Sequence, residues 1–250
     1  MKTSSRILSL ILVVMLAATG CSVIGNRIGR TITPSNVIIS ENRDVSGFSG
    51  IDMSTVGKVV LSQGSTESLT VSGSDNLVPL IKTTVRKGIL YIETTENINV
   101  ISFTSDNMLT YTIVVKDLSS LTISGLGDVQ MGTLTTPKLS VTMSGAGNAQ
   151  ISQLTTDELT VTVSGLGSVE LGGEAKQATI DISGAGSVNS PDLKIQTANV
   201  TIPGLGGATL WVTDRLTGNI SGAGNVSYYG NPQTNTNTSG LGNFKSLGNK

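Results

Sequence analysis

The sequence predicts an all-β protein whose second half is a single-stranded parallel β-helix, or solenoid, of about seven turns. A Gly-Leu-Gly or Gly-Ala-Gly tripeptide recurs behind a Ser or Pro at intervals of 18 to 20 residues. Apolar and small polar residues alternate on both sides of each tripeptide, as in half-buried strands. The composition, with 30 glycines and 13% charged residues, is typical of a turn-rich β protein. The residues that precede the tripeptides are Ser124, Ser144, Ser164, Ser183, Pro203, Ser221 and Ser239.

Residues 1–20 predict a signal peptide, because Lys2 and Arg6 precede an apolar run that is too short to span a bilayer. The run ends in Ala18-Thr-Gly before Cys21, the single cysteine of the chain. This order is similar to the lipobox of bacterial lipoproteins, although Ala18 stands where Leu is usual. We therefore expect a lipid on Cys21 that anchors an extracytoplasmic protein to a membrane, at the cell surface or in the periplasm. Ordinary secretion with an unmodified Cys21 is the alternative.

The charge and residue usage argue against several functional classes. Loss of the signal peptide takes two basic residues and no acidic ones, so the net charge falls from −1 to −3, which does not favour a nucleic-acid partner. The chain has no histidine, the commonest general base and zinc ligand. We expect no enzyme activity, no metal site and no cofactor.

The chain divides into segments of different regularity. Residues 21–44 lack periodicity and read as a tether from the lipid, and residues 45–117 form a less regular N-terminal β region. Arg86-Lys87-Gly88 predicts a hairpin turn in that region. Residues 118–250 form the β-helical repeat region. The strands expected before the repeats are Val56–Leu61, Leu69–Val71, Ile89–Ile92 and Leu109–Val115.

Each repeat is expected to be a strand, a glycine corner, a second strand and a bend. Val161 and its period-two neighbours should point inward, whereas the intervening positions should meet water. Glycine suits the corner because it tolerates φ > 0 and lets stacked backbones approach closely. The last repeat has polar residues at its inward positions, which favours either a polar end to the solenoid or a disordered tail at 231–238.

The middle residue of the tripeptide alternates between Leu and Ala without exception. We expect these side chains to stack on one another in the packed interior, large against small. The alternating residues are Leu126, Ala146, Leu166, Ala185, Leu205, Ala223 and Leu241.

Together with the repeats, several segments before them resemble the autotransporter adhesin head domain known as the GIN domain. The resemblance covers about residues 45–247. It implies a β-helical fold and an adhesive or envelope role, and it carries over no catalytic residue. The segments are Asp44–Phe48, Gly57–Gly64, Asp75–Leu77 with Ile81, and Gly88–Ile92.

The tripeptides do not predict a nucleotide or calcium site. The third glycine of a dinucleotide fingerprint is missing, and only Asp128 among the seven residues after the tripeptides is a carboxylate. Those seven residues more simply predict a hydrogen-bonded ladder. The carboxylates allow a rival interpretation, a β-helical lyase or glycosidase. Such an enzyme needs two carboxylates close together. The candidates are adjacent Asp157 and Glu158, Glu170 with Glu174, and Asp181.

The expected function is a non-catalytic, lipid-anchored adhesion, binding or scaffold module. Trp211, Tyr228 and Tyr229 follow two glycine corners and are the first candidates for a ligand surface. Thr160 and Thr162 form a Thr-x-Thr pair that could also bind a ligand, with a plain solvated face as the alternative. A carbohydrate or protein ligand, self-association and a purely structural role all remain open.

Overall fold

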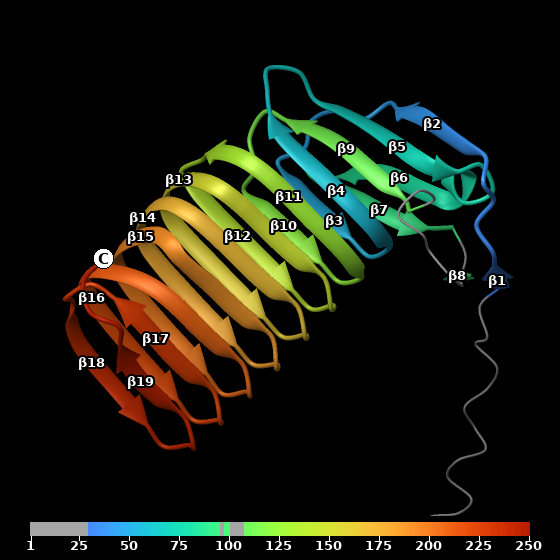
Figure 1. Ribbon diagram of the computed structural model, residues 1–250. Helices are drawn as coiled ribbons and strands as arrows, with labels where there is room; N and C mark the ends of the chain where they lie inside the picture. The colour runs from blue at the N-terminus through green and yellow to red at the C-terminus, as the bar shows by residue number, and fades with distance from the viewer. Residues whose placement is uncertain (1–29, 96–97, 101–107) are drawn as a thin grey trace, which may run out of the picture.

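The computed structural model describes residues 30–95, 98–100 and 108–250, and Figure 1 shows their strands stacked into an elongated rod. The repeat region is a β-solenoid, so the predicted fold class is confirmed. Its strands are β10 (Ser120–Ile123), β11 (Leu126–Thr135), β12 (Lys138–Met143), β13 (Asn148–Val163), β14 (Ser168–Ile182), β15 (Ser187–Ile202), β16 (Gly207–Ile220), β17 (Asn225–Tyr229), β18 (Gln233–Thr238) and β19 (Asn243–Ser246).

Strands of successive turns pair in parallel, one turn apart in the sequence. Val161 lies opposite Val141 on one side and Ile180 on the other, and the pairing continues through β16. The rod has two walls. The residues that lead into a glycine corner lie in the first wall, and the residues that leave it lie in the second. The long strands β13 to β16 run from one corner to the next and therefore contribute to both walls.

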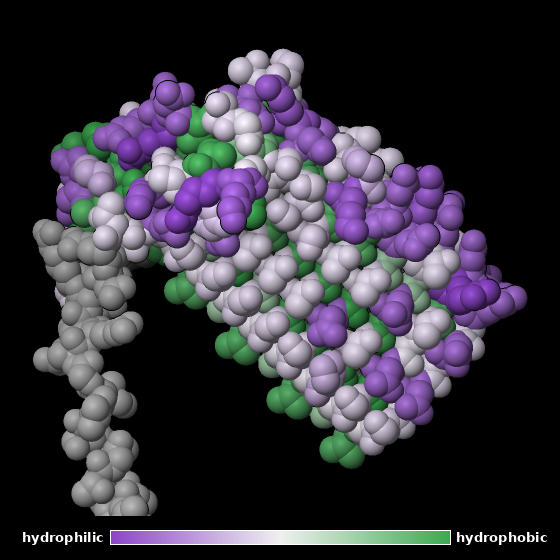
Figure 2. Space-filling view, turned by 180° about the vertical axis from the view of Figure 1, so that it is seen from behind, coloured by the Kyte–Doolittle hydropathy of each residue, from purple (hydrophilic) through white to green (hydrophobic). Residues whose placement is uncertain are grey.

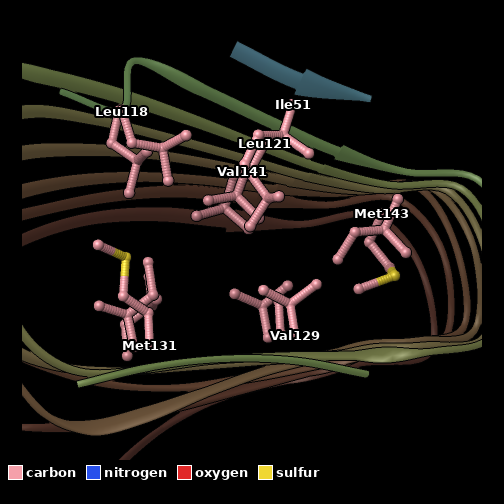
Figure 3. Close-up of a cluster of buried hydrophobic side chains, with 14 of the residues drawn as sticks. Ile51, Leu118, Leu121, Val129, Met131, Val141 and Met143 are labelled. Carbon is pink, nitrogen blue, oxygen red and sulfur yellow. The ribbon is translucent and has the colours of Figure 1, made fainter. Parts of the chain in front are cut away.

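The core lies between the two walls. The aliphatic side chains at the predicted inward positions of the repeats are buried, and Val161 is fully enclosed. In the last repeat the inward positions, Thr234, Thr236 and Thr238, are exposed at the end of the rod. In Figure 3, Val141 and Leu121 point from the first wall toward Val129 and Met131 on the second. Thr160 and Thr162 alternate with the buried positions and are partly exposed, so the inside and outside assignment of the strands is confirmed.

The N-terminal β region continues the same stack. It contains β3 (Gly50–Met53), β4 (Val56–Gln63), β5 (Ser68–Ser74), a 3-10 turn η1 (Val78–Leu80), β6 (Ile81–Arg86), β7 (Ile89–Thr94) and β9 (Thr110–Val115). β3 pairs with β10 and β4 with β11, so the turn between β3 and β4 is one more corner beneath the first tripeptide. The expected hairpin joins β6 to β7, and both Lys87 (φ 52°) and Gly88 (φ 76°) have the left-handed conformation that such a turn requires.

Part of the expected tether belongs to the folded region. β1 (Arg30–Ile32) pairs in parallel with β8 (Ile98–Val100), and β2 (Ile38–Arg43) pairs antiparallel with β5. β2 has no fully buried side chain, which explains why its sequence shows no clear apolar period. The signal peptide and Cys21 lie outside the described residues.

The expected position of the alternating Leu and Ala residues is wrong. The four leucines are exposed, by 65% at Leu126, 73% at Leu166, 70% at Leu205 and 92% at Leu241. The reason lies in the glycines beside them. A Cβ atom on Gly165 or Gly167 would overlap the carbonyl oxygen of the equivalent glycine one turn earlier. Because the glycines face the neighbouring turn, the residue between them projects away from the rod.

The tripeptide glycines are also not in the left-handed conformation, contrary to the expected φ > 0. Close approach alone requires glycine at these corners. The backbone ladder runs through the corner without interruption, since the Leu166 N–H donates to the Gly145 carbonyl at 3.0 Å and the Gly186 N–H to the Gly165 carbonyl at 3.0 Å.

The C-terminal end of the rod is ordered. The Asn and Thr residues of 233–238 form β18, which pairs with β16, so the interpretation as a disordered tail is wrong. Tyr228 and Phe244 are partly buried and pack against the last layer of the core. The Phe244 ring occupies the space that a Cβ atom on Gly218 would need, so this glycine makes room for an aromatic cap.

The close approach at the corners predicts a large difference between two glycine substitutions. Gly165→Ala should lower the free energy of unfolding by about 2 kcal/mol or more, because the methyl group would overlap backbone of the neighbouring turn. Gly132→Ala should change it by less than about 1 kcal/mol, since no atom lies within 4 Å of its Cβ position. Urea unfolding of both variants measures the difference, and equal midpoints would contradict the corner geometry.

Candidate ligand-binding face

The outer surface of the second wall carries a continuous polar face. Gln130, Gln150 and Glu170 lie opposite one another on β11, β13 and β14 and form a column that runs along the rod. A parallel column on the corner side contains Asp128, Asn148 and Ser168. We call these two columns, with Asn189 and Asp192, the polar face.

The polar face is hollowed along its length. One hollow of about 290 Å³ lies between Asp128 and Glu170, and another of about 250 Å³ extends from Gln150 to Asp192. The two hollows share Gln150 and Glu170, so they form one elongated depression across several turns. Amide and carboxylate groups line it, and they can bond to the hydroxyl or amide groups of an extended ligand.

A change in strand register shapes the second hollow. Between β14 and β15 the pairing shifts after Val169 and resumes at Gly173, whose φ of 108° favours glycine. The shift removes a backbone partner from the Leu171 N–H, which instead donates to the hydroxyl oxygen of Ser190 at 3.0 Å. Ser190 is almost completely buried, at 1% exposure. Its hydroxyl oxygen takes the place of a backbone acceptor where the register shifts.

Sequence reasoning did not identify Ser190. Its signal was available, because Ser190 is a polar residue at an inward position and lies in register with Leu210 of the next turn. The preceding turn is one residue shorter at this level and contains Gly172-Gly173. A missing residue in one turn and a buried hydroxyl in the next together indicate an interrupted ladder.

The corner-side column is held by mutual hydrogen bonds. The Asn148 backbone N–H and Nδ2 both donate to Asp128 Oδ1, at 3.1 and 3.0 Å, and the Ser168 hydroxyl donates to Asn148 Oδ1 at 2.6 Å. The predicted ladder is therefore present in this part of the rod. In the ranges that the structure describes, no group of three His, Cys, Asp or Glu side chains could hold a metal ion.

An aromatic pair lies beyond the end of the polar face. Trp211 of β16 and Tyr229 of β17 are register partners on neighbouring turns, and both are partly exposed. The Lys250 ammonium lies 5.4 Å from the centre of the Trp211 ring and 5.8 Å from that of Tyr229. It also forms an ion pair with Asp192, which lines the second hollow. Asp192 and Lys250 thus connect the polar face to the aromatic pair.

The other residues predicted for a ligand surface lie elsewhere. Tyr228 occupies an inward position in register with Leu210 and packs against the core. Thr160 and Thr162 lie on the first wall, on the opposite side of the core from the polar face. Of the five predicted residues, Trp211 and Tyr229 therefore lie side by side on the surface. Tyr228 points into the core, and Thr160 and Thr162 lie on the opposite wall.

The carboxylates considered for catalysis do not form a single group. Asp157 pairs with Lys176 at 2.7 Å and Glu158 with Lys138 at 3.0 Å, and all four side chains are more than half exposed. Glu174 lines a small hollow of about 130 Å³ with Asp157, Lys176 and Lys194 at the bend. The other two lie apart from this bend, with Glu170 on the polar face and Asp181 on the first wall opposite Thr162.

A comparison with family models matches residues 47–232 to the family described as "Putative auto-transporter adhesin, head GIN domain". The chain belongs to this family. The match confirms the resemblance found in the sequence, and the family is one of adhesin-like domains to which no catalytic function is ascribed. A search of curated proteins finds no match.

Solved structures show the same fold as this GIN domain. A crystal structure of a putative adhesin from Bacteroides fragilis is 29% identical, with a TM-score of 0.81, and 86% of this chain covers all of that one. A putative adhesin and a putative lipid binding protein, both from Parabacteroides distasonis, are 20% and 18% identical, with TM-scores of 0.66 and 0.72. In each case 87% of this chain covers all of the other. The described residues of the GIN domain contain no helix with the length and hydrophobicity of a membrane span.

The buried hydroxyl predicts a specific stability defect. Ser190→Ala should lower the free energy of unfolding by about 1 to 3 kcal/mol, because the Leu171 N–H would be buried without an acceptor. Ser187→Ala, on the same strand but partly exposed, should change it by no more than about 0.5 kcal/mol. Denaturant unfolding of both variants measures the effect, and a defect of the same size in both would exclude the assigned role of Ser190.

Proposed function

We propose that this GIN domain is a non-catalytic binding module of the bacterial envelope whose polar face and aromatic pair hold an extended carbohydrate. The observation that supports the proposal is the elongated depression from Asp128 to Asp192. Asp192 pairs with Lys250, which in turn lies near the rings of Trp211 and Tyr229. Amides and carboxylates bond to sugar hydroxyls, and aromatic rings pack against the apolar faces of sugars.

The rigidity of the stack suits such a ligand. The polar columns repeat at the spacing of successive strands, about 4.8 Å, so they offer polar groups at a regular interval along the rod. A polymer that itself repeats can use several of these groups at once, and the contacts add without ordering a loop. Adhesion by many weak, repeated contacts is consistent with the adhesin-like family.

Binding without chemical conversion fits the arrangement of the carboxylates. Glycoside hydrolysis normally uses two carboxyl groups on either side of the scissile bond. Here Asp157 and Glu158 are each engaged by a lysine of a neighbouring turn, and Glu170 lies in a different hollow. Glu174 shares only the small hollow at the bend with Asp157, together with Lys176 and Lys194. These contacts give Asp157 and Glu158 a role in joining turns.

The binding proposal predicts that loss of either side chain of the aromatic pair weakens binding. Trp211→Ala and Tyr229→Ala should each weaken binding of the purified protein to its best ligand in a polysaccharide array by about tenfold, through loss of a packing surface. Thr162→Ala, on the opposite wall, should bind like the parent protein. Unchanged binding in both aromatic variants would refute the proposed surface.

The same preparations distinguish binding from catalysis. The parent protein should release no reducing sugar or unsaturated product from the bound polysaccharide. The double variant Asp157→Asn with Glu158→Gln keeps the shape of both side chains and should bind as well as the parent. Turnover in the parent that disappears in this double variant would support the carbohydrate-active enzyme instead.

A lipid on Cys21 is the proposed means of attachment to the membrane. Cys21→Ser should move the protein from the membrane fraction to the soluble fraction, because one residue supplies the lipid. Mass spectrometry of the N-terminal peptide and fractionation of cells expressing each form measure this. Parent protein that is soluble and carries no acyl group would refute lipid anchoring.

A further inference from the structure

A row of four leucines projects from the corner edge of the rod, where the two walls meet. The leucines occur at every second corner, with an alanine at each corner between them, and Figure 2 shows such apolar projections one after another along the lower edge. We call this line of alternating residues the leucine row. Its members are Leu126, Ala146, Leu166, Ala185, Leu205, Ala223 and Leu241.

The fold does not require these leucines. The middle residue of the tripeptide points to solvent, so an alanine or a polar residue would be equally compatible with the corner. An exposed leucine at 65% to 92% exposure therefore adds apolar surface without adding to the core. Repetition of such a residue along one edge indicates an interaction surface.

The alternation is specific to this one position. The residues before the tripeptides are serine at six corners out of seven, and the residues after them follow no two-turn pattern. A two-turn repeat of the whole sequence would have imposed the same alternation on these flanking positions. The residues after the tripeptides are Asp128, Asn148, Ser168, Ser187, Gly207, Asn225 and Asn243.

The alternation defines the shape of the edge. Successive leucines lie two strands apart, about 9.6 Å, and the alanine between them leaves a gap of about the width of one leucine side chain. A flat apolar surface or a lipid layer would be served better by leucine at every corner. Projections separated by gaps instead fit a partner that has projections at the same spacing.

We propose that the leucine row binds the leucine row of a second copy of this chain in an antiparallel dimer. About a two-fold axis, three of the four leucines of one copy lie over an alanine of the other, and the partner makes the reciprocal contacts. The arrangement that overlaps all corners places the axis between Leu166 and Ala185. The facing pairs are Leu126 with Ala223, Leu166 with Ala185, Leu205 with Ala146, and Leu241 with Val56 of the corner before the repeats.

The flanks of the row allow this approach. Serines lie on one side and mainly Asn and Ser on the other, which gives the apolar line a polar rim. The charged residues in the two flanking columns are Lys58 and Asp128, which are opposite in sign and lie in register on neighbouring turns. Two copies therefore meet without a concentration of like charge.

The contact is narrow, and this determines its strength. A line one residue wide buries less than the roughly 800 Å² per partner of a standard stable interface. We therefore expect a weak dimer that dissociates on dilution. The leucine row borders the polar face along the column of Asp128, Asn148 and Ser168. The inference goes beyond the proposed carbohydrate site, because it concerns self-association and not ligand binding.

Sedimentation velocity of the chain with Cys21→Ser, which removes the proposed lipid, between about 10 μM and about 1 mM tests the proposal. The parent should show a dimer fraction that rises with concentration. Leu166→Ser with Leu205→Ser should weaken dimerisation at least tenfold. Val60→Ser, which removes a 37% exposed valine from the second wall, should leave it unchanged.

A variant that fills the gaps distinguishes specific interlocking of the two rows from nonspecific apolar association. Ala146→Leu with Ala185→Leu makes the edge more apolar. It should nevertheless abolish the dimer, because the new side chains would fill the gaps that the partner's leucines occupy. All substituted positions are exposed, so melting temperatures should match the parent and unfolding does not confuse the result.

Two outcomes would overturn the proposal. One is a gap-filled variant that associates as strongly as the parent, since a nonspecific apolar strip would behave in this way. The other is a parent that stays monomeric over the whole range. If that monomer binds phosphatidylcholine vesicles and loses this binding in the Leu166→Ser, Leu205→Ser variant, the occupant is a lipid surface.

Discussion

The close approach of backbone to backbone at the glycine corners is the constraint on which this structure depends. Hydrogen bonds between neighbouring corners continue the ladder of the strands, so each turn is paired along most of its length. Such contact is possible only where no Cβ atom faces the next turn. Two glycines per turn therefore fix the spacing of the stack, and the spacing in turn places every column of side chains.

The same constraint divides the side chains among surfaces. Strands joined by a tight corner form two walls, and period-two alternation sends aliphatic residues between the walls and Ser, Thr, Asn or Gln residues outward. Because the register repeats, a residue type at one position becomes a column along the rod. The polar face and the leucine row are both columns of this kind, and both inherit the rigidity of the ladder.

Most of the fold could be predicted from the sequence because its signals are repeated. The inward direction of Val161 and the outward direction of Thr162 follow from alternation alone. The direction of Leu166 could not be inferred in this way, since glycines flank it and alternation carries no information there. β2 escaped notice because an edge strand with half-exposed side chains has no apolar period. The candidate site was only partly predictable. Trp211 and Tyr229 lie together as expected, but the inward direction of Tyr228 follows only from its alignment with Leu210 of the preceding turn.

The departures from regularity mark the places where the repeat does more than stack. In the interior, Ser190 replaces an aliphatic residue where the register shifts, and the indentation it stabilises belongs to the polar face. At the corner edge, regularity itself is modified, since a two-turn alternation of Leu and Ala is superimposed on a one-turn fold. The fold repeats once per turn and does not require a period of two turns. A period of two turns on the outside of the rod can affect only a partner that lies along the rod. The spacing of the leucines therefore says more about the partner than their hydrophobicity does.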